Sequence, residues 1–280
     1  MLIHDDEKFL AVESSHSFGD AVFNIPLIKA ISEHYGHKVT VSTNEPYQDG
    51  YYNVPWINNI VVAAGLGYGS IMLRNLGYKH VIQITQNAKF PHYKTIDPDH
   101  SLIDTPLWVG RELGLPDFDQ RPMFFPTDEE IENTEEIVTG QPTIAIESHF
   151  NSGQSWAKPE DIEKIVEKFK DTHRILWLSN RDAPELDCVD DLLRFTRREV
   201  IMCLRAADIF FSVGSGFFCA SLALPKKWQP KKSVCLWRDV MFKYKNRLNE
   251  LKWHDDLTWV DGDWQLPQVL KDISGCGSVW

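Results

Sequence analysis

The sequence contains little cysteine, with five residues in 280 and none of them in a CxxC pair. An odd number at irregular spacing argues against a disulfide framework and against a zinc site. The sequence also lacks an uninterrupted apolar run of the roughly 20 residues that cross a bilayer. Its first residues are acidic where a secretion signal would be basic. We therefore expect reduced thiols, no metal, no transmembrane segment and a cytoplasmic location.

Positive charge is scarce overall, because the net charge is −11, but it is concentrated in one segment. Residues 226–252 hold nine Lys and Arg against Asp239 and Glu250, so this basic segment carries +7 and the rest of the chain −18. A field of this kind attracts an anionic partner such as a nucleotide, a phosphorylated acceptor, a membrane face or nucleic acid. Lysines also make a surface soluble without binding anything, and both interpretations remain open.

The order of apolar segments predicts an α/β protein built from two Rossmann-like halves. A chain of this length is comfortable as two domains, and Pro142 follows a break that places the boundary near residue 140, giving domains 1–140 and 141–280. Asp20 is expected to cap the first helix, acid-rich residues 128–136 to form an exposed helix, and residues 185–195 to form another. The strands are expected at 9–13, 38–43, 59–63, 80–84, 143–147, 174–179, 209–213, 233–237 and 258–260.

Two loops carry the residue types that bind and react with a ligand. In an open parallel sheet, ligands sit beyond the carboxyl ends of the strands. Residues 15–20 follow the first expected strand and present Asp20 at the start of a helix. Residues 213–216 follow the strand at 209–213, and the glycines around Ser215 allow phosphate to approach backbone N–H groups. We expect one loop in each half, with the two facing each other across a cleft.

Three blocks of sequence, at residues 17–31, 52–60 and 212–225, together resemble the heptosyltransferase-like glycosyltransferases of family 9. The first contains the Gly19-Asp20 pair and Pro26, the second contains Pro55, and the third contains Ser215 before a small-residue helix. Their order and spacing cover nearly the whole chain. The resemblance implies a GT-B-like fold, in which the amino-terminal half binds the acceptor and the carboxy-terminal half binds a sugar nucleotide.

That resemblance also implies a reaction and a set of site residues. It implies metal-independent, inverting transfer of a hexosyl, heptosyl or pentosyl group from a nucleoside-diphosphate sugar, with no cofactor. Asp20 matches the catalytic base, although a carboxylate there also serves as a helix cap. We expect the acceptor to contact His16, Ser17, Gly19 and His149. The donor is expected to contact Ser152, Gln154, Ser155, Lys158, Glu185, Gly214, Ser215, Gly216 and Phe217.

The chain departs from the family pattern around the donor loop. Gly214 and Cys219 stand where the family has an acid and a histidine, and Gln154 stands where a basic residue is usual. Lys158, Arg181 or the basic segment would then have to supply the missing charge.

Three functions consequently remain open. The first is a glycosyltransferase acting on a surface-glycan or glycolipid precursor, in the cytoplasm or peripheral at the inner membrane face. The second is a phage-type DNA glycosyltransferase that modifies a hydroxymethylated base in a host cytoplasm, which the basic segment and its aromatics suggest. The third is a non-catalytic protein that binds a sugar nucleotide or a glycan.

Overall fold

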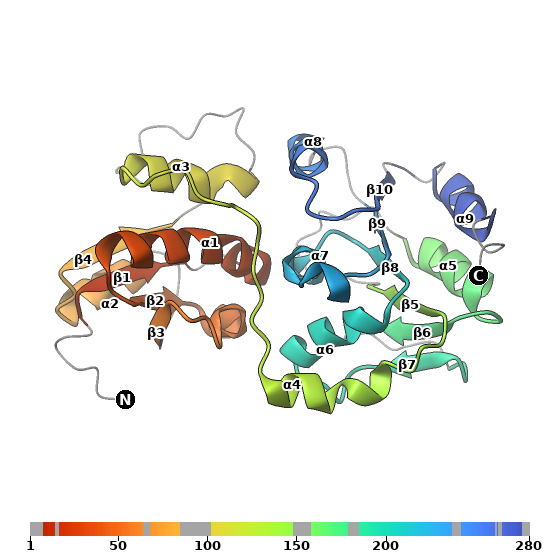
Figure 1. Ribbon diagram of the computed structural model, residues 1–280. Helices are drawn as coiled ribbons and strands as arrows, with labels where there is room; N and C mark the ends of the chain where they lie inside the picture. The colour runs from red at the N-terminus through yellow and green to blue at the C-terminus, as the bar shows by residue number, and fades with distance from the viewer. Residues whose placement is uncertain are drawn as a thin grey trace. The chain divides into compact units, whose positions relative to one another are not determined.

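The computed structural model divides the chain into two compact units, Met1–Thr127 and Asp128–Trp280 (Figure 1). It describes residues 8–14, 17–63, 68–84, 102–147, 158–178, 185–236, 242–260, 262 and 265–275. Each unit contains a parallel sheet covered by helices, as the sequence predicts. Among the helices in these residues, none combines the length and the hydropathy that a membrane span requires.

The first unit has a four-stranded sheet in the order β3-β2-β1-β4, and all its strand pairs are parallel. Its strands are β1 (Leu10–Glu13), β2 (Val39–Thr43), β3 (Ile57–Val62) and β4 (His80–Gln83). Its helical segments are α1 (Phe18–Tyr35), η2 (Glu45–Tyr51), α2 (Tyr68–Asn75), η3 (Leu102–Asp104) and α3 (Thr105–Glu112). Since β4 pairs with β1 and not with β3, the strand order reverses between β1 and β4.

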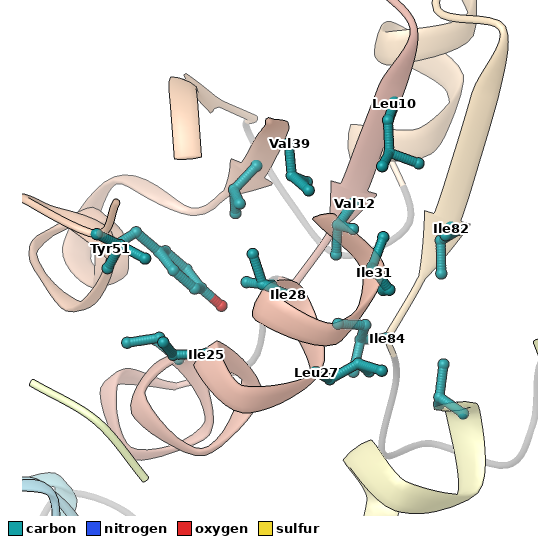
Figure 2. Packing of buried hydrophobic residues seen from close by; sticks show 14 of the residues in the cluster. Leu10, Val12, Ile25, Leu27, Ile28, Ile31, Val39, Tyr51, Ile82 and Ile84 are labelled. Carbon is teal, nitrogen blue, oxygen red and sulfur yellow. The ribbon is translucent and has the colours of Figure 1, made fainter. Parts of the chain in front are cut away.

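Helix α1 is apolar nearly all round because it is covered on several sides. Figure 2 shows its Ile25, Ile28 and Ile31 among buried side chains that include Val12 and Tyr51. Helix α3 also packs on α1, and a Cβ at Gly110 would lie 2.7 Å from a ring carbon of Phe118. A helix buried in this way has no amphipathic pattern, and its boundaries come instead from Ser17 and Gly36.

The second unit has a six-stranded parallel sheet in the order β10-β9-β8-β5-β6-β7. Its strands are β5 (Thr143–Ile146), β6 (Arg174–Trp177), β7 (Val189–Asp191), β8 (Ile209–Ser212), β9 (Lys232–Leu236) and β10 (Leu257–Val260). Its helical segments are α4 (Asp128–Asn133), η4 (Glu135–Ile137), α5 (Pro159–Phe169), α6 (Arg197–Cys203), η5 (Leu204–Ala206), α7 (Gly216–Ala223), η6 (Lys226–Trp228), α8 (Phe242–Leu251) and α9 (Leu266–Gly275). This is the strand order of dinucleotide-binding folds, and the reversal lies between β5 and β8.

The prediction of a helix at residues 185–195 is wrong. Strand β7 forms there instead and pairs with β6, with Val189 opposite Ile175. Its edge position explains the error, because a three-residue strand with one apolar residue shows no period that distinguishes it from a helix.

The acid-rich segment belongs to the second unit, which begins at Asp128. Arg198 binds both carboxylate oxygens of Glu130, and Arg205 binds Glu135. Helix α4 itself has no buried residue, so it is exposed as its charge suggests, whereas Thr134 just after it is fully buried. The preceding stretch is held on the first unit, where the Asn53 side-chain amide donates to the Pro126 carbonyl at 2.9 Å.

The described cysteines are free thiols, as expected from the sequence: Cys188, Cys203, Cys219 and Cys235. Burial raises the pKa of the Cys203 thiol to about 12, which keeps it protonated and unreactive. Cys276 lies outside the described residues.

The ion pair of Arg198 with Glu130 should be a main attachment of α4 to α6. The Arg198 side chain is 4% exposed and that of Glu130 is 15% exposed. Arg198→Ala removes the guanidinium that binds both oxygens of a mostly buried carboxylate, so we expect a loss of about 3–5 kcal/mol in the free energy of unfolding. Urea denaturation measures it.

Arg194→Ala is the control, because the nearby pair of Arg194 with Glu136 joins the residues before α6 to η4 with both side chains over 60% exposed. That change should cost less than about 1 kcal/mol. Equal losses in the two variants would contradict the attachment described here.

Candidate functional site

The two sheets carry a similar short sequence on the strand next to the reversal. Leu10-Ala11-Val12-Glu13-Ser14 covers β1, and Ile144-Ala145-Ile146-Glu147-Ser148 covers most of β5 and the residues after it. Both strands lie beside the point where the strand order reverses. Each half therefore places a glutamate at the carboxyl end of the strand where ligands bind in this class of sheet.

In the first unit, Ser17 and not Asp20 caps helix α1. The Ser17 hydroxyl accepts the Asp20 N–H at 3.2 Å and donates to Asp20 Oδ2 at 2.7 Å. The helix begins earlier than expected because Phe18 and Gly19 already have helical geometry, so Asp20 is its third residue. Its carboxylate lies in the first turn, where the helix dipole favours negative charge. Ser17 also fixes the orientation of that carboxylate.

A buried polar group lies close to Asp20, and it was not expected from the sequence. Ser14 accepts hydrogen bonds from the Asn24 amide at 2.7 Å and from the Tyr51 hydroxyl. Burial raises the pKa of Tyr51 well above its usual value, and the negative charge of Asp20 adds to the rise. Asn24 is four residues after Asp20, so the two side chains lie on the same face of α1. This spacing is the one sign in the sequence that Asn24 lies near Asp20.

Glu13, at the carboxyl end of β1, is hydrogen-bonded to two neighbouring elements of the first unit. Its Oε1 accepts the Gly69 N–H at 3.2 Å, and its Oε2 accepts the Gln83 amide at 2.8 Å. A Cβ at Gly69 would lie 2.5 Å from Ser42 Oγ, so only glycine lets α2 approach β1 and β2 this closely. We interpret Glu13 as structural.

In the second unit, the turn between β8 and α7 has the geometry of an anion-binding turn. Gly214 has φ +73°, in the left-handed region that favours glycine. Ser215 is the N-cap of α7, and its hydroxyl accepts the Phe217 N–H at 3.0 Å. Among the described residues, the N–H groups of Ser215 and Gly216 have no acceptor in the chain. These two donors are the ones available to phosphate.

Glu147 is buried beneath this turn and connects it to β5. Its carboxyl group accepts the Ser212 hydroxyl at 2.7 Å, the Ser215 hydroxyl, and a backbone N–H from Val213. Burial raises the pKa of Glu147 to about 7, although the same hydrogen bonds act in the opposite direction. The Ser215 hydroxyl therefore donates inward, to the buried carboxyl group.

The remaining expected site residues are divided between surface positions and undescribed ones. Lys158 precedes α5, and Glu185 lies in the connection from β6 to β7; both side chains are exposed. Among the described residues, neither side chain forms a hydrogen bond or an ion pair with Ser215. His16, His149, Ser152, Gln154 and Ser155 lie outside the described residues.

The basic segment is compensated in part by neighbouring acids. Three of its lysines form ion pairs with aspartates outside the segment, and Arg247 pairs with Glu250 at 3.0 Å. The lysine pairs are Lys226 with Asp255 at 2.7 Å, Lys231 with Asp208 at 2.8 Å and Lys232 with Asp256 at 3.1 Å. Trp253 is buried, so it is not available to stack on a base. These contacts weaken the case for a nucleic-acid surface.

No family model matches the sequence, and no curated protein matches it. Solved structures do match. A family 9 glycosyltransferase from Veillonella parvula has a TM-score of 0.63 and 12% identity, over 96% of this chain and 92% of that chain. Escherichia coli ADP-heptose LPS heptosyltransferase II has a TM-score of 0.67 and 11% identity, over 95% and 98%.

The Escherichia coli heptosyltransferase WaaC, solved with ADP-2-deoxy-2-fluoro heptose, has a TM-score of 0.57 and 11% identity, over 96% of this chain and 99% of that chain. The chain has the fold of the family 9 glycosyltransferases. The GT-B-like fold class and the resemblance to this family are therefore confirmed. The assignment of acceptor and donor to the two halves, and the cleft between them, stay predictions.

The raised pKa of Glu147 should make stability depend on pH. Below pH 4.5, the ordinary pKa, the residue is protonated whether the chain is folded or unfolded. Between pH 4.5 and 7 only the folded chain keeps the proton, so the contribution of Glu147 to stability falls as pH rises, by roughly 3 kcal/mol at most.

Chemical denaturation at pH 5.0 and 7.5 tests this in the wild type and in Glu147→Gln. The difference in unfolding free energy between the two proteins should shift in favour of the variant at the higher pH, since glutamine has no proton to lose. A difference that is the same at both pH values would show that Glu147 is not buried as described.

Proposed function

We propose that the chain is an inverting glycosyltransferase that moves a sugar from a nucleoside-diphosphate sugar to an acceptor hydroxyl. The observation that supports this most is the match of more than nine-tenths of the chain to heptosyltransferases, together with the polar side chains near both strand reversals. In this proposal the first unit binds the acceptor and the second binds the donor. The reaction needs a base for the acceptor and a stabilised leaving group.

The turn between β8 and α7 is proposed to hold the diphosphate. The N–H groups of Ser215 and Gly216 lie at the amino end of α7, where the helix dipole favours negative charge. Both groups stabilise the charge that develops on the leaving diphosphate, and they do so without a metal. We expect Lys158 and Glu185, together with Ser152, Gln154 and Ser155, to bind the rest of the donor.

Asp20 is proposed to be the catalytic base. Inversion requires one carboxylate that takes the proton of the acceptor hydroxyl as the hydroxyl attacks the anomeric carbon. Because Ser17 performs the capping, the Asp20 carboxylate is not required to begin the helix. Ser17 holds Oδ2 in place, and we expect Gly19, His16 and His149 to contact the acceptor.

The heptosyltransferases solved with ADP or its sugar derivative make ADP-sugars the first donors to examine. For the acceptor we propose a surface-glycan precursor, reached from the cytoplasm. DNA is a weaker candidate because three of the seven lysines of the basic segment pair with aspartates.

Asp20→Asn should lower kcat by about 10²–10⁴-fold, because the amide cannot accept the acceptor proton. Donor binding, read as a thermal shift, should be unchanged, since the substitution lies in the first unit. Glu33→Gln, on the same helix with an exposed carboxylate, is the control and should keep full activity. Undiminished transfer by Asp20→Asn would rule out Asp20 as the base and favour a different mechanism.

A panel of nucleoside diphosphates and their sugars should raise the melting temperature of the wild type. A ligand that binds only the folded chain stabilises it by about 2.7 kcal/mol at a hundred times its Kd. We expect ADP or an ADP-sugar among the compounds that act. A melting temperature unmoved by every nucleoside diphosphate would argue against the whole proposal, including a non-catalytic binding role.

A further inference from the structure

Glu147 and Ser215 are joined by a hydrogen bond, and the protonation state of Glu147 decides which of the two is the donor. Ser215 Oγ accepts the Phe217 N–H and donates its own proton to Glu147 Oε1. A serine hydroxyl has a single proton, so this arrangement leaves none to offer a ligand. An ionised carboxylate can only accept, so it holds the hydroxyl inward for as long as it is charged.

We propose that Glu147 is a positioning residue that controls the direction of the Ser215 hydroxyl: ionised, it turns the hydroxyl inward; protonated, it releases it toward the donor diphosphate. The inference rests on the proposed function, because it concerns the same anion-binding turn. From the sequence alone, Glu147 is only the last residue of an expected strand.

The two serines bound to Glu147 differ in what they can do after protonation. Ser212 is fully buried, and its hydroxyl also accepts the Gly214 N–H at 3.0 Å, so it keeps donating to Oε2. Ser215 lies at the amino end of α7 and is 7% exposed. A protonated Oε1 donates to Ser215 Oγ, and the serine proton then turns outward, toward the side where Ser215 and Gly216 present their N–H groups.

Electrostatics couple this proton to the anion. A diphosphate beside the turn repels a buried carboxylate, since burial leaves little water to screen the two charges. Bound diphosphate therefore favours the protonated form of Glu147. The pKa of Glu147 is already near neutrality through burial, so the proton is available at ordinary pH.

No charged side chain among the described residues opposes this coupling. The causes of the raised pKa are burial and hydrogen bonds from Ser215, Ser212 and Val213. Strands β5 and β8 contribute no ionisable side chain, and α7 contributes the buried thiol of Cys219. Strand β6 carries Arg174 at its opposite end, where it pairs with Asp190.

Calorimetric titration with ADP tests the inference in the wild type and in Glu147→Gln. Glutamine has the shape of protonated glutamate and cannot ionise. We expect the wild type to bind ADP about tenfold more tightly at pH 6 than at pH 8, after the change seen in the variant is subtracted. Titration in two buffers of different ionisation enthalpy should show proton uptake by the wild type and less by the variant.

Glu13→Gln is the matched control, because it removes the carboxylate at the same strand position in the first unit. It should leave the pH dependence of ADP binding as in the wild type. Ser215→Ala should bind ADP at pH 6 about as weakly as the wild type does at pH 8, since no hydroxyl remains to release. An equal pH dependence in wild type and Glu147→Gln would overturn the inference.

A measurement without ligand separates this inference from the proposed function. The amide resonances of Val213, Ser215 and Phe217 should shift with pH around a midpoint near 7 in the wild type and not in Glu147→Gln. If the resonances shift but no nucleotide binds, the proposed function is contradicted and the role of Glu147 in turning the Ser215 hydroxyl is supported. Nucleotide binding without the shift would overturn the role of Glu147 and leave the proposed function standing.

Discussion

The turn between β8 and α7 takes its shape from a carboxylate that reaches it from a neighbouring strand. Glu147 follows β5 and binds Ser212, Val213 and Ser215, which come 65 to 68 residues later in the chain. These contacts require that β5 and β8 pair, and the pairing occurs where the strand order reverses. The proposed donor site therefore depends on one buried side chain as much as on the glycines and the helix that form the turn.

The two halves use the same strand ending for different purposes. Glu13 and Glu147 occupy matching positions after similar apolar residues, and both are buried. Glu13 is bound by a glycine N–H and a glutamine amide, which fasten α2 and β4 to β1. Glu147 is bound mainly by hydroxyl groups, which can turn. A repeated strand thus carries a fixed contact in one half and an adjustable one in the other.

Much of the fold was predictable because its signals are local. Parallel strands buried on both faces are short apolar runs, and they alternate here with helices in the order that a doubly wound sheet requires. Errors occurred where local signals are weak or compete. Strand β7 has one apolar residue, so its sequence does not distinguish it from a helix. Asp20 is a good N-cap by residue type, but Ser17 is equally good and lies where the helix begins.

The sequence by itself determined the α/β class, the two halves, the Gly19-Asp20 pair at the start of a helix and the glycine-flanked Ser215, since each depends on residues that are adjacent in the chain. Only the tertiary structure decided which polar side chains meet: Tyr51 with Ser14, Arg198 with Glu130, and Glu147 with Ser215. The physical reason is that these pairs are separated by tens of residues and form only once strand order and helix packing are set. The pKa of Glu147 follows from that packing, because burial is a property of the folded chain.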